Sequence, residues 1–242
     1  MILAVIPARA NSRRLPGKNL MDLGGRPLIA YSILLARSIP EIDHVLVASD
    51  GVEILQAAAV WRAAILDLPT NLTGDEARLV GSLQYAVSIL EGCDDCFGKP
   101  IDWVVLLQPT SPLRLVPQCR GWIQEVLARP EVDGLLTVDL EPYKLAGTTP
   151  EGYYLPEYSP GIIKQQVKPR LRENGSLYIL KADNIRRGRL FGPRMLWREC
   201  RREQSLANID YAWDLDFTRW AYSHFGYDQE FQQMEAVLGQ HP

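Results

Sequence analysis

The 242-residue sequence lacks the features that would place it at a membrane or on nucleic acid. No apolar run approaches the roughly 20 residues that span a bilayer. The apolar start, residues 1–7, has no basic leader and reaches Arg9 too soon for a signal peptide. The formal net charge of −3 gives no overall attraction to nucleic acid or anionic lipid. We therefore expect a cytoplasmic protein that binds neither membrane nor nucleic acid.

Cysteine and histidine are also scarce. Cys93 and Cys96 form a Cys-x-x-Cys pair, which is typical of redox chemistry or half of a zinc site. No second pair of ligands has metal-ligand spacing, and the flanking Asp94 and Asp95 would raise a thiol pKa. We expect ordinary reduced thiols in a loop. The three histidines have no partner pattern for catalysis, so we assign them no role.

Apolar residues make up 47% of the chain, enough for a sizeable core, and they fall into alternating patterns. Short apolar runs predict strands at 2–6, 45–48, 63–66, 103–107 and 134–138. Helical periodicity falls between them, at 27–36, 52–61, 75–90 and 117–128. This alternation predicts an α/β, Rossmann-like, mostly parallel sheet with helices on both faces. Ligands bind outside the carboxyl ends of such strands, so segments 8–19, 49–50 and 108–114 should converge on one pocket.

The pattern changes between residues 139 and 173, where Pro, Gly and Tyr become frequent and no long helix can be drawn. A structureless loop of this length would be unusual in a compact domain. We therefore interpret residues 139–173 as a small extended appendage of a single domain, residues 1–242, that packs on a partner subunit or covers the substrate. A long surface loop is the alternative. Regular structure is expected again at 176–180, 206–209 and 212–223.

A strongly basic turn follows the first predicted strand. Arg9, Arg13, Arg14 and Lys18 place four positive charges within ten residues, with small residues between them. Arginine offers forked contacts to phosphate and lysine a mobile charge, and successive backbone N–H groups can bind an anion. The spacing matches neither a P-loop nor a dinucleotide fingerprint. The turn therefore predicts a site for a triphosphate, with a solvated basic loop as the alternative.

Sequence motifs occur in a fixed order along nearly the whole chain. Residues 8–19 contain the basic turn, and residues 106–114 read Leu-Leu-Gln-Pro-Thr-Ser-Pro-Leu-Arg. The other motifs lie at residues 25–29, 165–166, 174–178 and 208–215. Together these motifs resemble the acylneuraminate cytidylyltransferases, the CMP-sialic acid synthetases. The resemblance implies a nucleotidyltransferase fold and transfer of CMP from CTP to the anomeric hydroxyl of a sialic-acid-like 2-keto-3-deoxy sugar acid, with release of pyrophosphate, by a homodimer.

The resemblance assigns roles to individual residues. The catalytic residues would be Arg9, Lys18 and Asp210, with Lys18, expected on an exposed loop, neutralising charge that develops on the phosphates. The residues implied in nucleotide binding are Ala8, Arg9, Ala10, Asn11, Ser12, Arg13, Lys18 and Asn19. The residues implied in sugar binding are Gln108, Thr110, Ser111, Lys144, Lys164, Gln165 and Tyr178. Of these, Lys144 and Lys164 correspond to cations that meet the sugar carboxylate or reach across the dimer.

The resemblance also implies a bound Mg²⁺ (or Mn²⁺) ion. Asp210 matches a metal ligand of the family, and carboxylates suit this hard cation. The companion position holds Asn208, whose amide oxygen brings no negative charge, so nucleotide phosphates should supply more of the metal binding. The alternative interpretation of Asp210 is a carboxylate that caps the helix beginning near Ala212.

One departure from the family pattern affects the base pocket. Leu68 stands where the family usually carries an arginine near the nucleotide. Arg78, on the next predicted helix, is a candidate to replace the positive charge of that arginine near the nucleotide. The alternative is that Arg78 faces solvent. This departure and Asn208 leave other functions open: use of another nucleotide, an octulosonate-type sugar acid, or a catalytically silent nucleotide-binding protein. A third class, an adapter whose basic turn binds a protein partner, is a further alternative.

Overall fold

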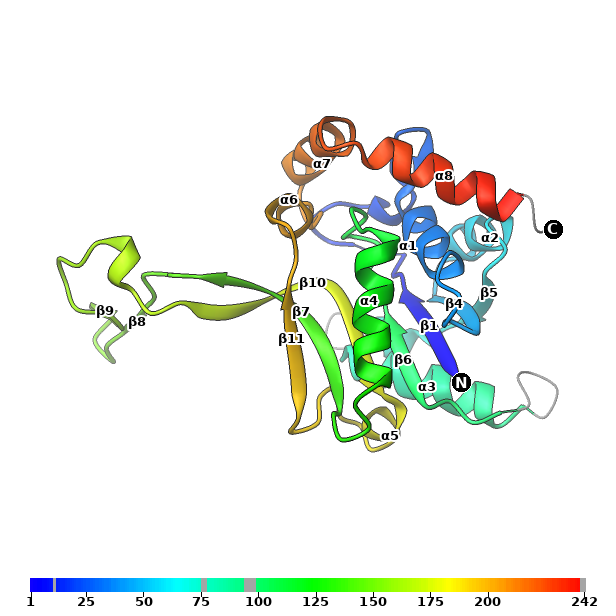
Figure 1. The fold of residues 1–242 in the computed structure, drawn as a ribbon, viewed down its shortest axis with the longest axis horizontal. Helices are drawn as coiled ribbons and strands as arrows, with labels where there is room; N and C mark the ends of the chain where they lie inside the picture. Colours follow the sequence, from blue (N-terminus) through cyan, green and yellow to red (C-terminus); the bar gives the residue numbers. More distant parts are fainter. Residues whose placement is uncertain (11, 75–77, 94–98, 240–242) are drawn as a thin grey trace.

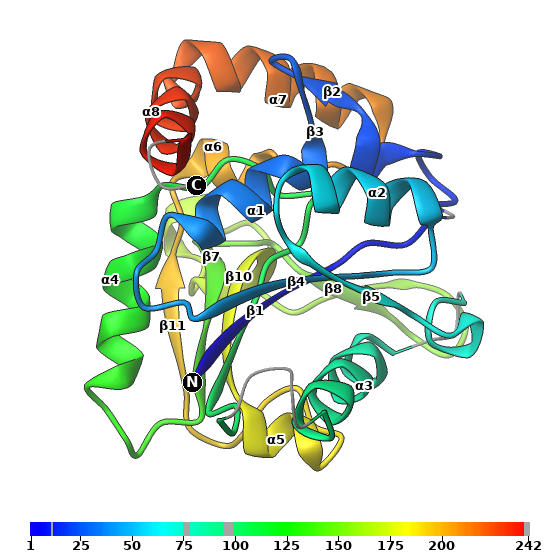
Figure 2. The ribbon, with the colours of Figure 1, turned by 90° about the vertical axis from the view of Figure 1, so that its right-hand side faces the viewer.

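Seven strands form one central sheet with helices on both faces (Figure 1, Figure 2). The computed structural model describes residues 1–10, 12–74, 78–93 and 99–239. In chain order the strands are β1 (Ile2–Pro7), β4 (His44–Ser49), β5 (Ala64–Asp67), β6 (Trp103–Leu106), β7 (Gly134–Glu141), β10 (Arg170–Lys181) and β11 (Met195–Glu199). Across the sheet their order is β11-β7-β10-β6-β1-β4-β5, and β10 runs antiparallel to both neighbours. The predicted α/β class and mostly parallel sheet are confirmed.

The helices divide between the two faces of the sheet (Figure 2). One face carries α1 (Leu28–Arg37), α2 (Val52–Val60), α4 (Val116–Leu127), α7 (Ala212–His224) and α8 (Tyr227–Gly239). The other carries α3 (Leu79–Glu91) and α5 (Ala182–Arg186). Shorter elements are η1 (Lys18–Leu20), η2 (Thr70–Leu72), α6 (Arg202–Leu206) and the pair β2 (Asp22–Leu23) and β3 (Arg26–Pro27). None of the described helices is long and apolar enough to cross a bilayer.

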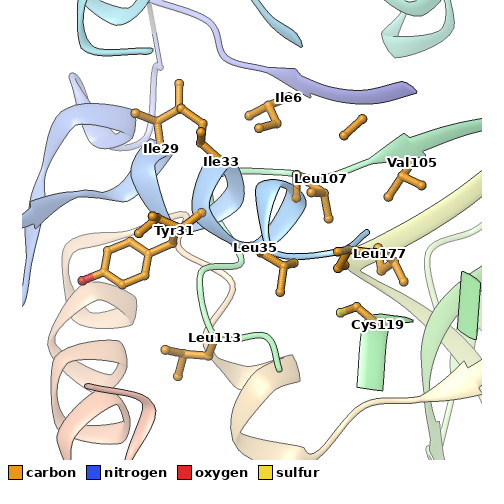
Figure 3. Packing of buried hydrophobic residues seen from close by; sticks show 14 of the residues in the cluster. Ile6, Ile29, Tyr31, Ile33, Leu35, Val105, Leu107, Leu113, Cys119 and Leu177 are labelled. Atoms are coloured by element: carbon orange, nitrogen blue, oxygen red, sulfur yellow. The ribbon is translucent and has the colours of Figure 1, made fainter. Parts of the chain in front are cut away.

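The first strand is buried on both sides, as its continuous apolar sequence predicts. Successive side chains of a strand point to opposite faces. Ile2, Ala4 and Ile6 pack in the larger core cluster, which Figure 3 shows around α1. Leu3 and Val5 pack in the smaller cluster, with residues of α3 and α5. The central strand therefore joins two cores, and its carboxyl end is held rigidly.

The structure differs from the sequence prediction mainly in the last third of the chain. β10 begins at Arg170, well before the predicted strand at 176, because it continues its pairing with β7 outside the core. Residues 207–209 form no regular element and follow α6 directly. Strand β11 and helix α8 were not predicted at all. The predicted start of the third long helix, at residue 75, lies outside the described residues.

An extended hairpin projects from the body of the molecule (Figure 1). The outer parts of β7 and β10 lead to β8 (Ala146–Thr148), β9 (Tyr154–Pro156) and η3 (Lys164–Gln166). Several large apolar side chains of this hairpin are exposed, among them Tyr153 and Ile163. The described chain offers no cover for them, so the dimerisation role expected for residues 139–173 stays a prediction.

The cysteines are only partly as expected. Cys119 is buried, Cys200 is partly buried, and both thiols are free. Cys93 is disulfide-bonded, so the expectation of a reduced thiol is wrong for this residue. The expectation of reduced thiols rested partly on a raised thiol pKa. A thiol pKa controls how fast a disulfide forms, but it does not decide whether two sulfurs lie within bonding distance. Cys96 lies outside the described residues.

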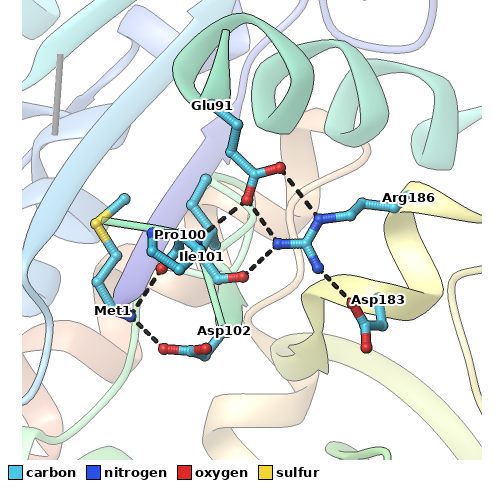
Figure 4. A network of polar contacts seen from close by, with 7 residues as sticks. All are labelled: Met1, Glu91, Pro100, Ile101, Asp102, Asp183 and Arg186. Atoms are coloured by element: carbon cyan, nitrogen blue, oxygen red, sulfur yellow. Dashed lines mark hydrogen bonds and ion pairs between the residues drawn. The ribbon is translucent and has the colours of Figure 1, made fainter. Parts of the chain in front are cut away.

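A polar network closes the opposite end of the sheet from the basic turn (Figure 4). Arg186 of α5 donates to both carboxylate oxygens of Glu91 at the end of α3, at 2.6 and 3.1 Å, and to the Ile101 carbonyl at 2.6 Å. Glu91 accepts the Ile101 N–H at 3.1 Å. Met1 adds its amino group, which pairs with Asp102. This network ties two helices to the strand that leads to the site.

Glu91→Gln should lower stability at neutral pH by roughly 1 kcal/mol, because it breaks a charge-assisted pair that is only partly exposed. Hydrogen bonds from Arg186 hold the pKa of Glu91 below its ordinary value. A carboxylate with a depressed folded-state pKa stabilises the fold above its unfolded pKa, about 4.3, and loses that contribution as pH falls through the folded pKa.

Urea unfolding of wild type and variant from about pH 7 to about pH 3 should therefore show a difference that shrinks with acidification. Glu131→Gln is the control, since Glu131 is exposed and has no ion pair among the residues described here. A difference that is constant over this pH range would contradict the assigned role of the Glu91 charge.

Candidate active site

A cleft of about 520 Å³ opens at the carboxyl ends of β1 and β6. Four segments far apart in the sequence contribute described residues to its lining: the basic turn after β1, Leu79 at the start of α3, residues 108–110 after β6, and the residues before α7. The predicted convergence of segments 8–19 and 108–114 is therefore confirmed. Residues 49–50 do not line the cleft; instead the Asp50 carboxylate accepts the Ala10 N–H at 2.8 Å and supports the turn from behind.

The basic turn is held in shape by contacts on both sides. Asn19, which is buried, donates its side-chain N–H to the Arg9 carbonyl at 2.9 Å. Arg9 donates to the Gly74 carbonyl at 3.0 Å. Gly17 has a φ of 68°, a left-handed conformation that suits glycine, and it turns the chain into η1. Arg9, Ser12, Arg13, Arg14, Lys18 and Asn19 all line the cleft.

Asp210 is the acidic residue that meets this turn. Its carboxylate lies 3.0 Å from Lys18 Nζ and 2.7 Å from an Arg14 guanidinium nitrogen. Lys18 also donates to the Ile209 carbonyl at 3.0 Å, and its side chain is only 13% exposed. The expectation that Lys18 lies on an exposed loop is thus wrong, because the segment before α7 covers it. The predicted catalytic residues Lys18 and Asp210 are in direct contact.

The position of Asp210 is fixed by its own turn. The buried Asp214 carboxylate accepts the backbone N–H groups of Asp210, at 2.8 Å, and Tyr211, at 2.7 Å. The Ile209 N–H donates to the Thr110 carbonyl at 2.8 Å. Asp214 therefore caps α7, and the alternative interpretation of Asp210 as the capping carboxylate is wrong. The Asp210 side chain is left to face the cleft and its cations.

The segment after β6 contributes Gln108 and Thr110 to the cleft, as predicted. The Gln108 side chain lies against Gly175, which has a φ of 75°. A Cβ at Gly175 would come within 2.7 Å of Gln108 Oε1 and 3.8 Å of Asn208 Nδ2. Gly175 thus lets the backbone of β10 approach the two amide side chains that line one side of the cleft.

Other predicted substrate-binding residues do not line the cleft within one chain. Ser111 and Tyr178 are buried, and Tyr178 packs in the smaller core, stacked on Phe191 at 6.1 Å between ring centroids. Lys144, Lys164 and Gln165 lie on the projecting hairpin. There Lys144 donates to the Ile162 carbonyl at 2.6 Å and Lys164 pairs with Glu141 at 3.0 Å. Their roles toward a sugar stay predictions.

The nucleotide-binding predictions divide in a similar way. Ala8 is buried and extends the pairing of β1 by donating its N–H to the Ala48 carbonyl at 3.0 Å. Arg78 is exposed at the start of α3 and does not line the cleft, whereas Leu79, which follows it, does. Leu68 is buried in the smaller core. Asn11 lies outside the described residues.

The resemblance implies no individual role for Arg14, one of the four charges of the basic turn, and the structure places it at the cleft. Besides its ion pair with Asp210, its guanidinium lies over the Tyr211 ring, 5.7 Å from the centroid. The basic run itself was the signal, since Arg14 is one of its four charges. Its partner could not be found from the sequence because Asp210 and Arg14 are 196 residues apart.

The residues of the cleft fit a metal ion only together with phosphates. Among the described residues, no group of three or more His, Cys, Asp or Glu side chains is placed to hold a metal. Among the described residues that line the cleft, Asp210 is the one carboxylate, and the Asn208 amide lies two positions before it in the sequence. Magnesium is often bound through one or two carboxylates plus substrate phosphates and waters. This donor set suits an ion that arrives with a nucleotide.

The fold and the cleft together define a nucleotidyltransferase-type α/β protein. The solved structure of CMP:2-keto-3-deoxy-manno-octonic acid synthetase complexed with CTP shares this fold, with a TM-score of 0.68 at 18% identity over 92% of this chain and 98% of that chain. Residues 3–113 match the family model described as Cytidylyltransferase. CMP-N,N'-diacetyllegionaminic acid synthase of Legionella pneumophila is 32% identical over 188 residues, 76% of this chain and 79% of that relative.

Pseudaminic acid cytidylyltransferase of Campylobacter jejuni is 38% identical over 112 residues, which cover 46% of this chain and 47% of that relative. The similarity to this relative thus spans about half of each protein. The chain belongs to the cytidylyltransferase family that the ordered sequence motifs indicate. The predicted family membership is confirmed.

Asp214→Ala should weaken the binding of CTP roughly three- to tenfold, because Asp210 loses the carboxylate that orders its turn. It should also lower stability by about 1–2 kcal/mol, since the start of α7 loses its cap. Calorimetric CTP titrations and thermal melts measure the two effects. Asp216→Ala is the matched control on the same helix, where the side chain is 76% exposed. Equal CTP affinity in both variants would contradict the positioning of Asp210 by Asp214.

Proposed function

We propose that this cytidylyltransferase acts on a sialic-acid-like 2-keto-3-deoxy nonulosonate, transferring CMP from CTP to its anomeric hydroxyl. The observation that carries the proposal is the cleft in which the cations of the basic turn meet Asp210, opposite Gln108 and Thr110. The relatives whose names specify legionaminic and pseudaminic acid support a nonulosonate. An octulosonate is the alternative, supported by a relative whose name specifies 3-deoxy-manno-octulosonate.

The reaction makes different demands on the two sides of the cleft. The sugar hydroxyl oxygen forms a bond to the α-phosphorus and releases its proton to water, while the bond from that phosphorus to the pyrophosphate oxygen breaks and its electron pair leaves with pyrophosphate. Negative charge grows on the leaving pyrophosphate. Lys18 and Arg9 supply fixed positive charge beside it, which is the usual protein contribution to such transfers. Gln108 and Thr110 offer amide and hydroxyl groups suited to the acceptor sugar.

We further propose that Asp210 and Asn208 hold a Mg²⁺ (or Mn²⁺) ion together with the nucleotide phosphates. When bound, the ion would supply charge neutralisation at those phosphates. The Asp210 carboxylate already lies among cations in the cleft, so a divalent ion would share or replace their contacts. Because Asn208 adds no charge, the nucleotide must supply most of the remaining ligands.

We also propose that the chain works as a homodimer through the projecting hairpin. Its exposed aromatic and aliphatic residues, Tyr153, Tyr154, Leu155 and Ile163, suit a subunit interface. In the described part of the chain, Lys144 and Lys164 contact residues of their own hairpin. Their proposed contact with the sugar carboxylate would then be made in the cleft of a second copy.

Pyrophosphate release from each nucleoside triphosphate, paired with each of four sugar acids, tests the proposed reaction. The acids are N-acetylneuraminate, legionaminate, pseudaminate and 3-deoxy-manno-octulosonate. Turnover with CTP and a nonulosonate, dependent on magnesium, is the expected result. Turnover only with the octulosonate would replace the substrate assignment. Nucleotide binding without turnover in any combination would favour a catalytically silent protein.

Lys18→Met should lower kcat by about 100- to 1,000-fold, because a fixed charge beside the reacting phosphates is lost. Methionine keeps most of the aliphatic stem, so the largely buried position of the Lys18 side chain stays filled. Steady-state kinetics measure the effect, and thermal melts check that the variant is folded. Lys99→Met, at an exposed position, is the control. An unchanged kcat in Lys18→Met would remove Lys18 from the reaction.

Asn208→Asp should lower the magnesium concentration needed for half-maximal CTP binding, because a second carboxylate strengthens a site for a hard cation. Calorimetric CTP titrations at graded magnesium concentrations measure this shift without any need for turnover. Asn71→Asp, an exposed position outside the cleft, controls for added negative charge. Identical magnesium dependence in wild type and Asn208→Asp would show that residue 208 does not face the metal.

A further inference from the structure

A fully buried arginine lies beneath the sugar side of the cleft. The Arg114 side chain is 1% exposed, and the described residues give it no carboxylate partner. Its guanidinium donates from Nε to the Ser176 carbonyl at 2.6 Å and from Nη2 to the Gln108 carbonyl at 2.7 Å. A third bond runs from Nη1 to the Ser32 hydroxyl at 3.0 Å. All its partners are neutral oxygens.

Stability alone does not explain this arginine. Moving a charge out of water without an opposite charge is costly, and apolar side chains of similar size often serve a fold as well or better. Burial lowers the pKa of Arg114 to about 10, so the charge persists at neutral pH. Burial also raises the pKa of the nearby Cys119 to about 12, so this thiol stays neutral and offers no counter-charge.

One of the two carbonyls that Arg114 holds belongs to a residue that lines the cleft, and the other belongs to the stretch of β10 that packs against that residue. Gln108 follows β6 and lines the cleft directly. Ser176 lies in an irregular stretch of β10, where the register with β7 shifts between Glu173 and Tyr178. This stretch contains Gly175, against which the Gln108 side chain lies. The planar guanidinium has donors in a fixed fork, so it sets the separation of its acceptors.

We propose that Arg114 is a positioning residue that fixes Gln108 against the irregular stretch of β10 and so places the Gln108 amide for the acceptor sugar. This inference rests on the proposed function, in which Gln108 faces the sugar acid. Arg114 does not touch the substrate; it acts through the backbone of its neighbours. A lysine in its place would keep a charge but reach only one of the two carbonyls at a time.

Steady-state kinetics with CTP and the best nonulosonate test this role in Arg114→Lys, Arg114→Met and Gly175→Ala. All three variants should raise KM for the sugar acid about tenfold or more while KM for CTP changes about twofold or less. Gly175→Ala leaves Arg114 intact, but its added Cβ displaces the Gln108 side chain. Arg114→Lys should retain more of the sugar affinity than Arg114→Met.

Ser32→Ala is the matched control, because Ser32 is the one guanidinium acceptor that belongs to helix α1 rather than to the cleft. This variant should lower the melting temperature and leave both KM values unchanged. Arg114 variants that lower the melting temperature as Ser32→Ala does, without a selective rise in KM for the sugar acid, would overturn the proposal.

If neither Arg114 variant folds, Gly175→Ala decides the question: an unchanged KM for the sugar acid overturns the placement of Gln108, and a selective rise supports it. The proposed function fails separately, if wild type shows no turnover with any pairing of nucleotide and sugar acid. That result would overturn the positioning role as well, since no acceptor sugar would then exist. Wild-type turnover with unmoved KM values in all three variants overturns the positioning role alone.

Discussion

The Asp210 carboxylate links the segment before α7 to the basic turn after β1. The basic turn concentrates like charges in a short segment, and these charges repel one another when no anion is present. Asp210 lies between Lys18 and Arg14 and offsets part of that repulsion. The hydrogen bonds to the Asp214 carboxylate and to the Thr110 carbonyl hold the segment that carries Asp210. They therefore keep the Asp210 carboxylate between the two cations.

Elements with an unambiguous apolar pattern could be predicted from the sequence. β1, β4 and β6 are buried on both faces, so their sequences are short, nearly continuous apolar runs that are typical of strands. Strand β11 is an edge strand, partly exposed and charged at its end, and gives no such run. β10 runs antiparallel to β6 and β7. The pattern of side chains along a strand does not show which strands it pairs with or in which direction. Helix α8 did leave a signal, since its buried Tyr227, Phe231 and Met234 follow helical spacing.

Prediction of which residues converge on the cleft succeeded where backbone position alone decides the outcome. Lys18, Gln108 and Asp210 follow or precede regular elements at one edge of the sheet, and parallel strands bring such positions together. It failed where the direction of a side chain decides. Ser111 and Tyr178 belong to matching motifs, yet both side chains point into the protein. Motif spacing cannot show this, because a turn or an irregular strand reorients each residue separately.

A site for a nucleotide must provide both affinity for the triphosphate and discrimination between bases. The cleft's cations all belong to the basic turn and suit phosphates, which are the same in every nucleoside triphosphate. Such contacts supply affinity but do not discriminate between bases, because discrimination is a difference in free energy between competing ligands. At the position where the family usually carries an arginine, Leu68 is buried in the core and offers the base no charge. The exposed Arg78 does not line the cleft in its place. Under the proposed function, the basic turn accounts for affinity for the triphosphate but not for the choice of base, and the two departures from the family pattern, Leu68 and Arg78, bring no charge to the cleft.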